Sequence, residues 1–229
     1  DMICEVKFAQ WTAAGKLRAP VFLGLRADVK PNEVRRESLA GKKMIAGKDA
    51  NVTLDIDGHQ LQFTNLDKLY FPEDGLTKRD VLNYYAEVSP YLLPMLEDRP
   101  LSLKRYPDGI LGKTFFQKNL PESTPEWIDA IKLYSDDSKR MIRYCLCANL
   151  ATLLYLVNLG CIDHHPWLSR VNDLDSPDSL LIDLDGNGAP FGKVVEGALA
   201  MKELIEEVGL SSVVKTSGGD GVHVLIPLE

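Results

Sequence analysis

Two aspartates close an apolar stretch of the sequence. In Ser179-Leu-Leu-Ile-Asp183-Leu-Asp185 the apolar residues predict a strand, and the acids lie two positions apart at its end. Because side chains of a strand alternate between its faces, Asp183 and Asp185 are expected on one face. Carboxylate oxygens are the ligands that hard divalent cations prefer, and a pair of such ions assists phosphoryl transfer. The pattern therefore predicts metal-assisted phosphate chemistry.

Two other interpretations of this strand end remain open. One is a calcium-binding helix-loop-helix, whose first loop positions match Asp183, Asp185 and Asn187. That motif needs a Glu at the twelfth loop position, where this sequence has Val194, and a helix where a strand is expected. The other interpretation is a solvated turn, in which both carboxylates simply face water.

A glycine-rich segment lies between two expected strands near residue 220. It is Thr216-Ser-Gly-Gly-Asp-Gly-Val-His223, and it is not a Walker loop because no Gly-Lys-Ser/Thr follows. Glycines let the backbone approach an anion closely and aim N–H groups at it, while Ser217 and His223 can donate to phosphate oxygens. Together with the acidic pair, this segment predicts one site for metal and phosphate.

The elements that must position these residues predict an α+β fold. Strands are expected at residues 2–11, 17–26, 52–57, 59–64, 101–105, 114–118, 178–184, 213–215 and 222–227. Helices are expected after the N-cap Thr77, from Pro90, at 146–159 and at 193–208. Strands and helices do not alternate strictly, which favours α+β over a doubly wound sheet.

Composition and charge exclude several classes of protein. Of the 229 residues, 45% are hydrophobic and 26% charged, and no apolar run reaches the length of a membrane-spanning helix, about 18 residues. Four cysteines are too few for a disulfide scaffold, which favours a reduced, cytoplasmic compartment. A net charge of −7 argues against a protein that coats nucleic acid indiscriminately.

The acidic pair and the glycine-rich segment resemble the archaeo-eukaryotic primase superfamily, in particular the polymerase domain of bacterial ATP-dependent DNA ligase D. The resemblance covers most of residues 60–229. Its further motifs are Phe63-Thr-Asn65-Leu-Asp-Lys68, Gly75-Leu-Thr-Lys78, Arg99-Pro-Leu-Ser-Leu-Lys104-Arg105-Tyr106, Phe115-Phe116-Gln-Lys118 and Asp163-His-His165-Pro-Trp167. It implies a primase-like polymerase domain with mixed or antiparallel sheets and flanking helices.

The resemblance also implies a role for each motif residue. Asp183 and Asp185 would be the catalytic ligands of a two-metal Mn²⁺ or Mg²⁺ site. The nucleoside triphosphate would be bound by Ser217, Gly218, Gly219, His223, His165, Lys104 and Arg105. The DNA, with its downstream 5′-phosphate, would be bound by Asn65, Lys68, Lys78, Phe115 and Phe116. Adjacent strand residues point to opposite faces, so both phenylalanines cannot be core, and one is expected to stack on a template base.

The first residues resemble a different module. Residues 16–30 are similar to the last motif of ATP-dependent DNA ligases, and its cations would be Arg18, Arg26 and Lys30. Val29 interrupts the Asp-Lys pair usual at that place. The expected organisation is a remnant of the ligase oligonucleotide-binding barrel at 1–38, a linker at 39–51 and the polymerase domain at 52–229. The nucleotidyltransferase body that bears the ligase nucleophile would precede this chain.

The resemblance implies a fragment of a DNA ligase D of bacterial non-homologous end joining. The parent would add nucleotides, preferably ribonucleotides, to 3′ ends at breaks and gaps, in partnership with the Ku end-binding protein and close to the nucleoid. Two departures bear on activity: Asp220 stands where relatives often have a cation, and the family's third carboxylate is expected beyond Glu229. The fragment is therefore expected to be inactive. A non-catalytic module for DNA ends and a metal-dependent phosphohydrolase remain the alternatives.

Overall fold

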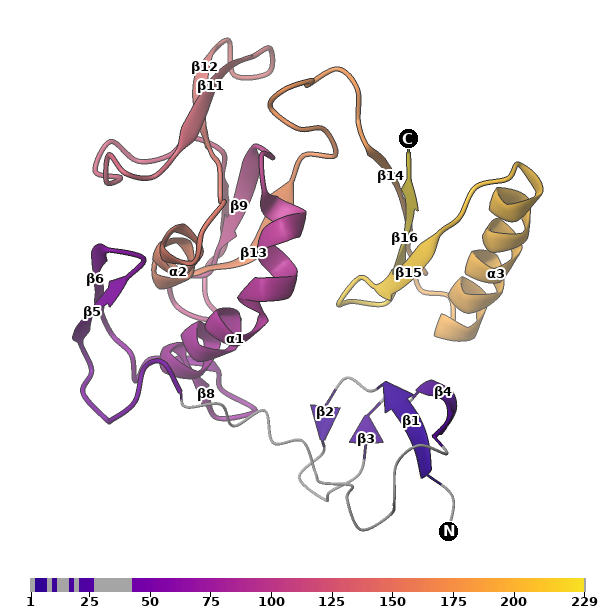
Figure 1. Ribbon diagram of the computed structural model, residues 1–229, viewed down its shortest axis with the longest axis horizontal. Helices are drawn as coiled ribbons and strands as arrows, with labels where there is room; N and C mark the ends of the chain where they lie inside the picture. The colour runs from indigo at the N-terminus through magenta and orange to yellow at the C-terminus, as the bar shows by residue number, and fades with distance from the viewer. Residues whose placement is uncertain (1–2, 8–9, 12–16, 19–20, 27–42, 229) are drawn as a thin grey trace. The chain divides into compact units, whose positions relative to one another are not determined.

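The computed structural model describes residues 3–7, 10–11, 17–18, 21–26 and 43–228 (Figure 1). The chain divides into two compact units, Asp1–Lys42 and Lys43–Glu229. Three helices lie within the described residues, and none is long and apolar enough to cross a membrane. Antiparallel sheets with segregated helices confirm the α+β prediction.

The first unit contains two antiparallel strand pairs. Strand β1 (Ile3–Lys7) pairs with β4 (Val21–Arg26), and β2 (Gln10–Trp11) pairs with β3 (Leu17–Arg18). These pairs confirm the hairpin expected from residues 2–11 and 17–26. Arg18 and Arg26 end two of the strands, whereas Lys30 lies outside the described residues, so the ligase-like role of all three stays a prediction.

The second unit begins with residues that the sequence assigned to a linker. Ile45 is only 1% exposed and packs in the core, and its N–H donates to Asn83 Oδ1 at 2.8 Å. Strands β5 (Val52–Ile56) and β6 (His59–Phe63) then form the expected hairpin. Asp57 and Gly58 at its turn have φ angles of 53° and 81°, which a tight two-residue hairpin turn requires.

Helix α1 (Lys78–Leu96) follows the short strands β7 (Leu69–Phe71) and β8 (Leu76–Thr77). Thr77 caps it as predicted, because the Thr77 hydroxyl accepts from the Asp80 N–H and the Asp80 carboxylate accepts from the Thr77 N–H. The separate helix expected from Pro90 is wrong, since α1 continues through Pro90 and Pro94.

The larger sheet has five strands within residues 43–228. They are β9 (Leu101–Arg105), β10 (Phe115–Gln117), β11 (Ala130–Ser135), β12 (Arg140–Cys145) and β13 (Cys161–Pro166). All pairs are antiparallel, in the order β10-β9-β12-β11, and β13 also pairs with β9. The sequence predicted β9 and β10 but not β11, β12 or β13.

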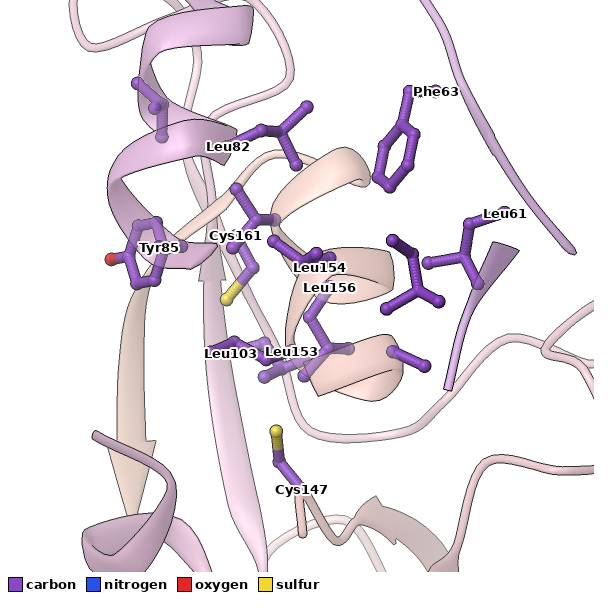
Figure 2. Close-up of a cluster of buried hydrophobic side chains, with 14 of the residues drawn as sticks. Leu61, Phe63, Leu82, Tyr85, Leu103, Cys147, Leu153, Leu154, Leu156 and Cys161 are labelled. Carbon is purple, nitrogen blue, oxygen red and sulfur yellow. The ribbon is translucent and has the colours of Figure 1, made fainter. Parts of the chain in front are cut away.

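The core of this part lies between the larger sheet, α1 and helix α2 (Leu150–Asn158). Figure 2 shows Leu153, Leu154 and Leu156 of α2 within it, surrounded by Leu61 and Phe63 from β6 and by Leu103 from β9. Burial of these side chains removes apolar surface from water, which is the main force that holds the layers together. The core thereby fixes β9, the strand that carries Lys104 and Arg105.

A smaller sheet carries the acidic pair. Its strands are β14 (Ser179–Leu184), β16 (Val222–Pro227) and β15 (Val213–Thr216), in that order and all antiparallel. Helix α3 (Phe191–Glu207) lies against one face, where Ile205 packs with Val224 and Ile226 (Figure 1). The expected strands and helix of this part are confirmed.

Candidate functional site

Asp183 and Asp185 lie on one exposed face at the end of β14. The alternate residues Ile182 and Leu184 point to the other face, where they pack on the small core beneath α3. This alternation is the one that the strand pattern predicted. In the described part of the chain, β14 is an edge strand of the smaller sheet and β16 is its central strand.

The glycine-rich segment lies directly beside the two acids. His223 pairs with Asp183 across β14 and β16, and its Nε2 is 3.4 Å from the Asp183 Oδ1. Gly221 approaches so closely that a Cβ built on it would lie 2.5 Å from Asp185 Oδ1. Asp183, Asp185, His223 and the glycine-rich segment therefore lie together. We call this group the acidic edge.

Residues 217–221 form a loop that closes on itself; we call it the glycine loop. The Ser217 N–H donates to the Gly221 carbonyl at 3.0 Å, and the Ser217 hydroxyl accepts from the Gly219 N–H at 3.4 Å. Gly218 has a φ of +98°, which L side chains rarely adopt. The side chain of Ser217 thus shapes the loop, and Asp220 stands exposed within it.

The carboxylates fit a divalent cation by the chemistry of their oxygens. Among residues 43–228, no group of three or more His, Cys, Asp or Glu side chains gathers closely enough to hold a metal ion. The described residues thus supply two carboxylate ligands, Asp183 and Asp185. Their role as metal ligands stays a prediction.

A second group of predicted residues shares one face of the larger sheet. Lys104 pairs with Phe116 across β9 and β10, and its ammonium lies 5.8 Å from the centre of the Phe116 ring. The ring of His165 on β13 lies 5.4 Å from that of Phe116. We call Lys104, Phe116 and His165 the Lys104 face.

The Lys104 face and the acidic edge lie within electrostatic reach of each other. Burial is the main cause that lowers the pKa of His165, and the positive charges of Lys104 and His223 lower it further, against the effect of Asp163. Charge effects of this kind fade beyond about 10 Å at moderate ionic strength. The charge of His223 on the acidic edge thus acts on His165 of the Lys104 face.

The structure separates Arg105 from Lys104, although the sequence placed both in one nucleotide site. Arg105 donates to the Leu159 carbonyl at 2.9 Å and to Gln117 Oε1 at 2.8 Å, and its guanidinium lies 5.3 Å from the centre of the Phe115 ring. The separation follows from strand geometry, because neighbouring residues point to opposite faces. Both phenylalanines are exposed, Phe115 by 41% and Phe116 by 62%, so neither is core.

Arg105 lies instead near the predicted phosphate-binding lysines. Lys78 is 4% exposed, and its ammonium donates to the Thr64 carbonyl at 2.9 Å. Burial is the main cause that lowers the pKa of Lys78 to about 8, and the charges of Lys68 and Arg105 contribute. We call Lys68, Lys78 and Arg105 the basic cluster.

Three further residues complete the surroundings of the basic cluster. The ammonium of Lys68 donates to Asp108 Oδ1 at 2.6 Å and to the Pro107 carbonyl at 2.8 Å. Asn65 has a φ of 53° and begins the turn that presents Lys68, because its carbonyl accepts from the Lys68 N–H at 3.0 Å. Asn65, Lys68 and Lys78 are thus brought together, as the sequence predicted for one site.

Comparison with known proteins decides the family. The family model described as LigD, primase-polymerase domain, matches residues 77–229. The chain belongs to the LigD primase-polymerase family. It is 33% identical over its whole length to the multifunctional non-homologous end joining protein LigD of Pseudomonas aeruginosa, and 36% identical over 74% of its length to the bifunctional LigD of Bacillus subtilis. It spans 27% of each of these relatives.

A solved structure agrees with this assignment. The polymerase domain of Mycobacterium tuberculosis ligase D, determined in complex with DNA, superposes with a TM-score of 0.68 at 29% sequence identity. The match covers 74% of this chain and 61% of the mycobacterial one. The fold described above is thus the fold of a LigD polymerase domain.

Three residues beside the predicted site residues were not predicted from the sequence. Asp108 contacts Lys68, whereas Tyr106 and Asp163 lie beside Lys104. All three are within or next to the quoted motifs, but none was given a role. The alternation applied to Phe115 and Phe116 would also have separated Lys104 from Arg105, whereas the position of Asp163 depends on an irregular strand pairing that local sequence does not reveal.

Proposed function

We propose that this chain forms the nucleotide- and DNA-end-binding part of a LigD polymerase that acts in non-homologous end joining. The parent protein would add nucleotides, preferentially ribonucleotides, to 3′ ends at breaks to which the Ku end-binding protein directs it. The observation that carries this proposal is the acidic edge, where Asp183 pairs with His223 and Gly221 lies against Asp185. Acids, a phosphate-type glycine loop, two imidazoles and an exposed aromatic ring together suit a nucleoside triphosphate.

Each group of residues has a part in this proposal. Asp183 and Asp185 would hold Mn²⁺ or Mg²⁺, which when bound neutralises charge that develops on phosphate oxygens. Ser217, the N–H groups of the glycine loop and His223 would bind the triphosphate. Lys104 would add a positive charge from the larger sheet, and Phe116 would offer its exposed ring to a base.

The basic cluster is proposed to bind the 5′-phosphate of the downstream strand. The buried ammonium of Lys78 and the partly exposed one of Lys68 match a phosphate group, which takes several charge-assisted hydrogen bonds. The mycobacterial polymerase domain was solved in complex with DNA, which supports DNA binding here. Arg105 belongs to this cluster and Phe115 extends it, so we assign Arg105 to the DNA rather than to the nucleotide.

Two binding measurements on this chain test the proposal. Fluorescence anisotropy with gapped DNA should show about tenfold tighter binding when the downstream strand carries a 5′-phosphate, since each charge-assisted hydrogen bond contributes about 1.5–3 kcal/mol. Lys68→Ala should remove most of that advantage. ATP with Mn²⁺ should bind to the chain, and Asp183→Asn should abolish the Mn²⁺ dependence while it leaves the 5′-phosphate advantage intact.

Other outcomes would favour the alternatives. A 5′-phosphate advantage without Mn²⁺-dependent ATP binding would indicate a non-catalytic module for DNA ends. Release of phosphate from ATP without DNA, unaffected by Phe116→Ala, would indicate a phosphohydrolase. If the unmodified chain shows neither Mn²⁺-dependent ATP binding nor a 5′-phosphate advantage, the proposal is contradicted altogether.

A further inference from the structure

An irregular pairing turns Asp163 toward Lys104. Along β13 and β9, Cys161 pairs with Arg105 but Asp163 pairs with Lys104, so that Ile162 is one extra residue. Paired residues of antiparallel strands point to the same face, and a bulge redirects the side chains that follow it. Without the bulge, Ile162 would occupy the place of Asp163. Bulges are frequent next to functional sites for this reason.

Tyr106 fixes the Asp163 carboxylate. Its hydroxyl donates to Asp163 Oδ2 at 2.6 Å, and the residue is only 5% exposed. The Tyr106 N–H donates in turn to the Gly160 carbonyl at 2.7 Å, which ties the end of β9 to the residue before β13. The carboxylate therefore has a defined position although part of it faces solvent.

Three side chains lie near the Lys104 ammonium. Its Nζ lies 3.6 Å from Asp163 Oδ2, 5.5 Å from the centre of the Tyr106 ring and 5.8 Å from that of Phe116. A lysine has a flexible stem, and to order it costs conformational entropy when a ligand binds. Contacts that order the side chain beforehand reduce this cost.

We propose that Asp163, held by Tyr106, is a positioning residue that fixes the Lys104 ammonium beside His165 for the phosphates of a bound nucleotide. This inference rests on the proposed function, because it takes Lys104 as a nucleotide-binding residue. The opposite role is physically distinct: a carboxylate that only adds negative charge would repel the triphosphate. The two roles predict changes of opposite sign.

The Kd of ATP with Mn²⁺, measured by isothermal titration calorimetry, decides between them. Asp163→Asn keeps the size of the side chain and an acceptor for Tyr106 but removes the charge. We expect Kd to rise about three- to fivefold, since a partly exposed ion pair contributes up to about 1 kcal/mol. Tyr106→Phe removes the hydroxyl that holds Asp163 and should also raise Kd. A lower Kd in Asp163→Asn would overturn the proposal.

A double-mutant comparison separates positioning from general structural damage. In the Lys104→Ala background, Asp163→Asn should have no further effect on Kd, because its action passes through Lys104. The control is Asp136→Asn, whose carboxylate also lies 3.6 Å from a lysine, Lys139, in the turn between β11 and β12. This variant should bind ATP as the unmodified chain does.

The outcomes distinguish this inference from the proposed function. An unmodified chain that does not bind ATP contradicts the proposed function itself. The inference alone is contradicted by a different result: Lys104→Ala weakens ATP binding, but Asp163→Asn raises Kd by the same factor in the unmodified chain and in the Lys104→Ala background. If thermal denaturation shows that Asp163→Asn does not fold, Tyr106→Phe decides the question by the same comparison with Lys104→Ala.

Discussion

Lys78 is the side chain whose surroundings are most unusual for its type. Lysine is rarely buried without a carboxylate partner, and among residues 43–228 no Asp or Glu oxygen lies within 4.0 Å of its ammonium. Burial and the nearby charges of Lys68 and Arg105 lower its pKa. A lysine kept in such a place costs stability while it is charged, which is typical of a residue retained for an anionic ligand.

The lowered pKa of Lys78 predicts a pH dependence. The amine is charged below its pKa of about 8 and neutral above it, and a bound phosphate stabilises the charged form. The 5′-phosphate advantage in DNA binding should therefore be full at pH 7 and decline as pH rises through 8 to 9. Anisotropy titrations at these three pH values measure it. In Lys78→Met the advantage should be smaller and independent of pH, and a constant advantage in the unmodified chain would contradict this role.

Gly221 is the other residue whose type is dictated by its neighbours. A Cβ there would lie 2.5 Å from both Asp185 Oδ1 and the Leu184 carbonyl, and the latter is backbone that cannot turn aside. Gly221→Ala should displace the acidic edge and weaken Mn²⁺-dependent ATP binding by about tenfold or more, equivalent to about 1.4 kcal/mol. Gly192→Ala on α3, where a Cβ meets nothing within 4 Å, is the matched control and should bind normally. Equal affinities for ATP in the two variants would contradict this role of Gly221.

At the scale of an element, α1 shows how a helix tolerates an internal proline. Pro90 lacks the N–H that would donate to the Ala86 carbonyl four residues earlier. The hydroxyl of Ser89 donates to that same carbonyl at 2.8 Å. Ser89 is itself buried, so its side chain supplies the hydrogen bond that the backbone cannot.

This compensation predicts a specific loss of stability. Ser89→Ala leaves the Ala86 carbonyl without this partner and should lower the free energy of unfolding by about 1 kcal/mol, as measured by urea denaturation. Adding Pro90→Ala restores an N–H at that position, and the double variant should recover most of the loss. If the single variant is as stable as the unmodified chain, the hydroxyl does not have this role.

The elements also show which parts of the fold local sequence specifies. The turn at Asp57 and Gly58 and the cap at Thr77 were predictable, because each depends on a few adjacent residues. The passage of α1 through Pro90 was not, since it depends on one side-chain hydrogen bond. Half of the residues of strand β13 are polar, and the strand pairs with β9, so its strand state depends on a partner distant in sequence. The acidic edge was predictable; the bulge that places Asp163 was not.

At the scale of the second unit, the proposed nucleotide site depends on two sheets that different cores stabilise. Asp178, just before β14, joins them. Both its oxygens accept from Arg99, at 2.5 and 2.6 Å, and its Oδ2 accepts from Arg170 at 2.9 Å. Arg99 is 7% exposed and also donates to the Trp167 carbonyl at 3.1 Å, directly after β13. The hydrogen bonds from Arg99 are the main cause that lowers the pKa of Asp178. The junction therefore contributes its full stability at pH values above the ordinary carboxyl pKa, and it loses this contribution as pH falls through the lowered pKa.

If this junction sets the distance between the acidic edge and the Lys104 face, its removal should affect the two proposed ligands differently. Asp178→Asn should lower the free energy of unfolding by about 1–2 kcal/mol, a figure reduced because the carboxylate is partly exposed. Binding of ATP with Mn²⁺, which needs residues of both sheets, should weaken. The 5′-phosphate advantage should persist, because the basic cluster belongs to β9 and the segments around α1. Glu196→Gln, which loses only an exposed pair with Lys193, is the control. Equal weakening of both ligands in Asp178→Asn would indicate general destabilisation, and unchanged ATP binding would mean that something other than Asp178 holds the two sheets together.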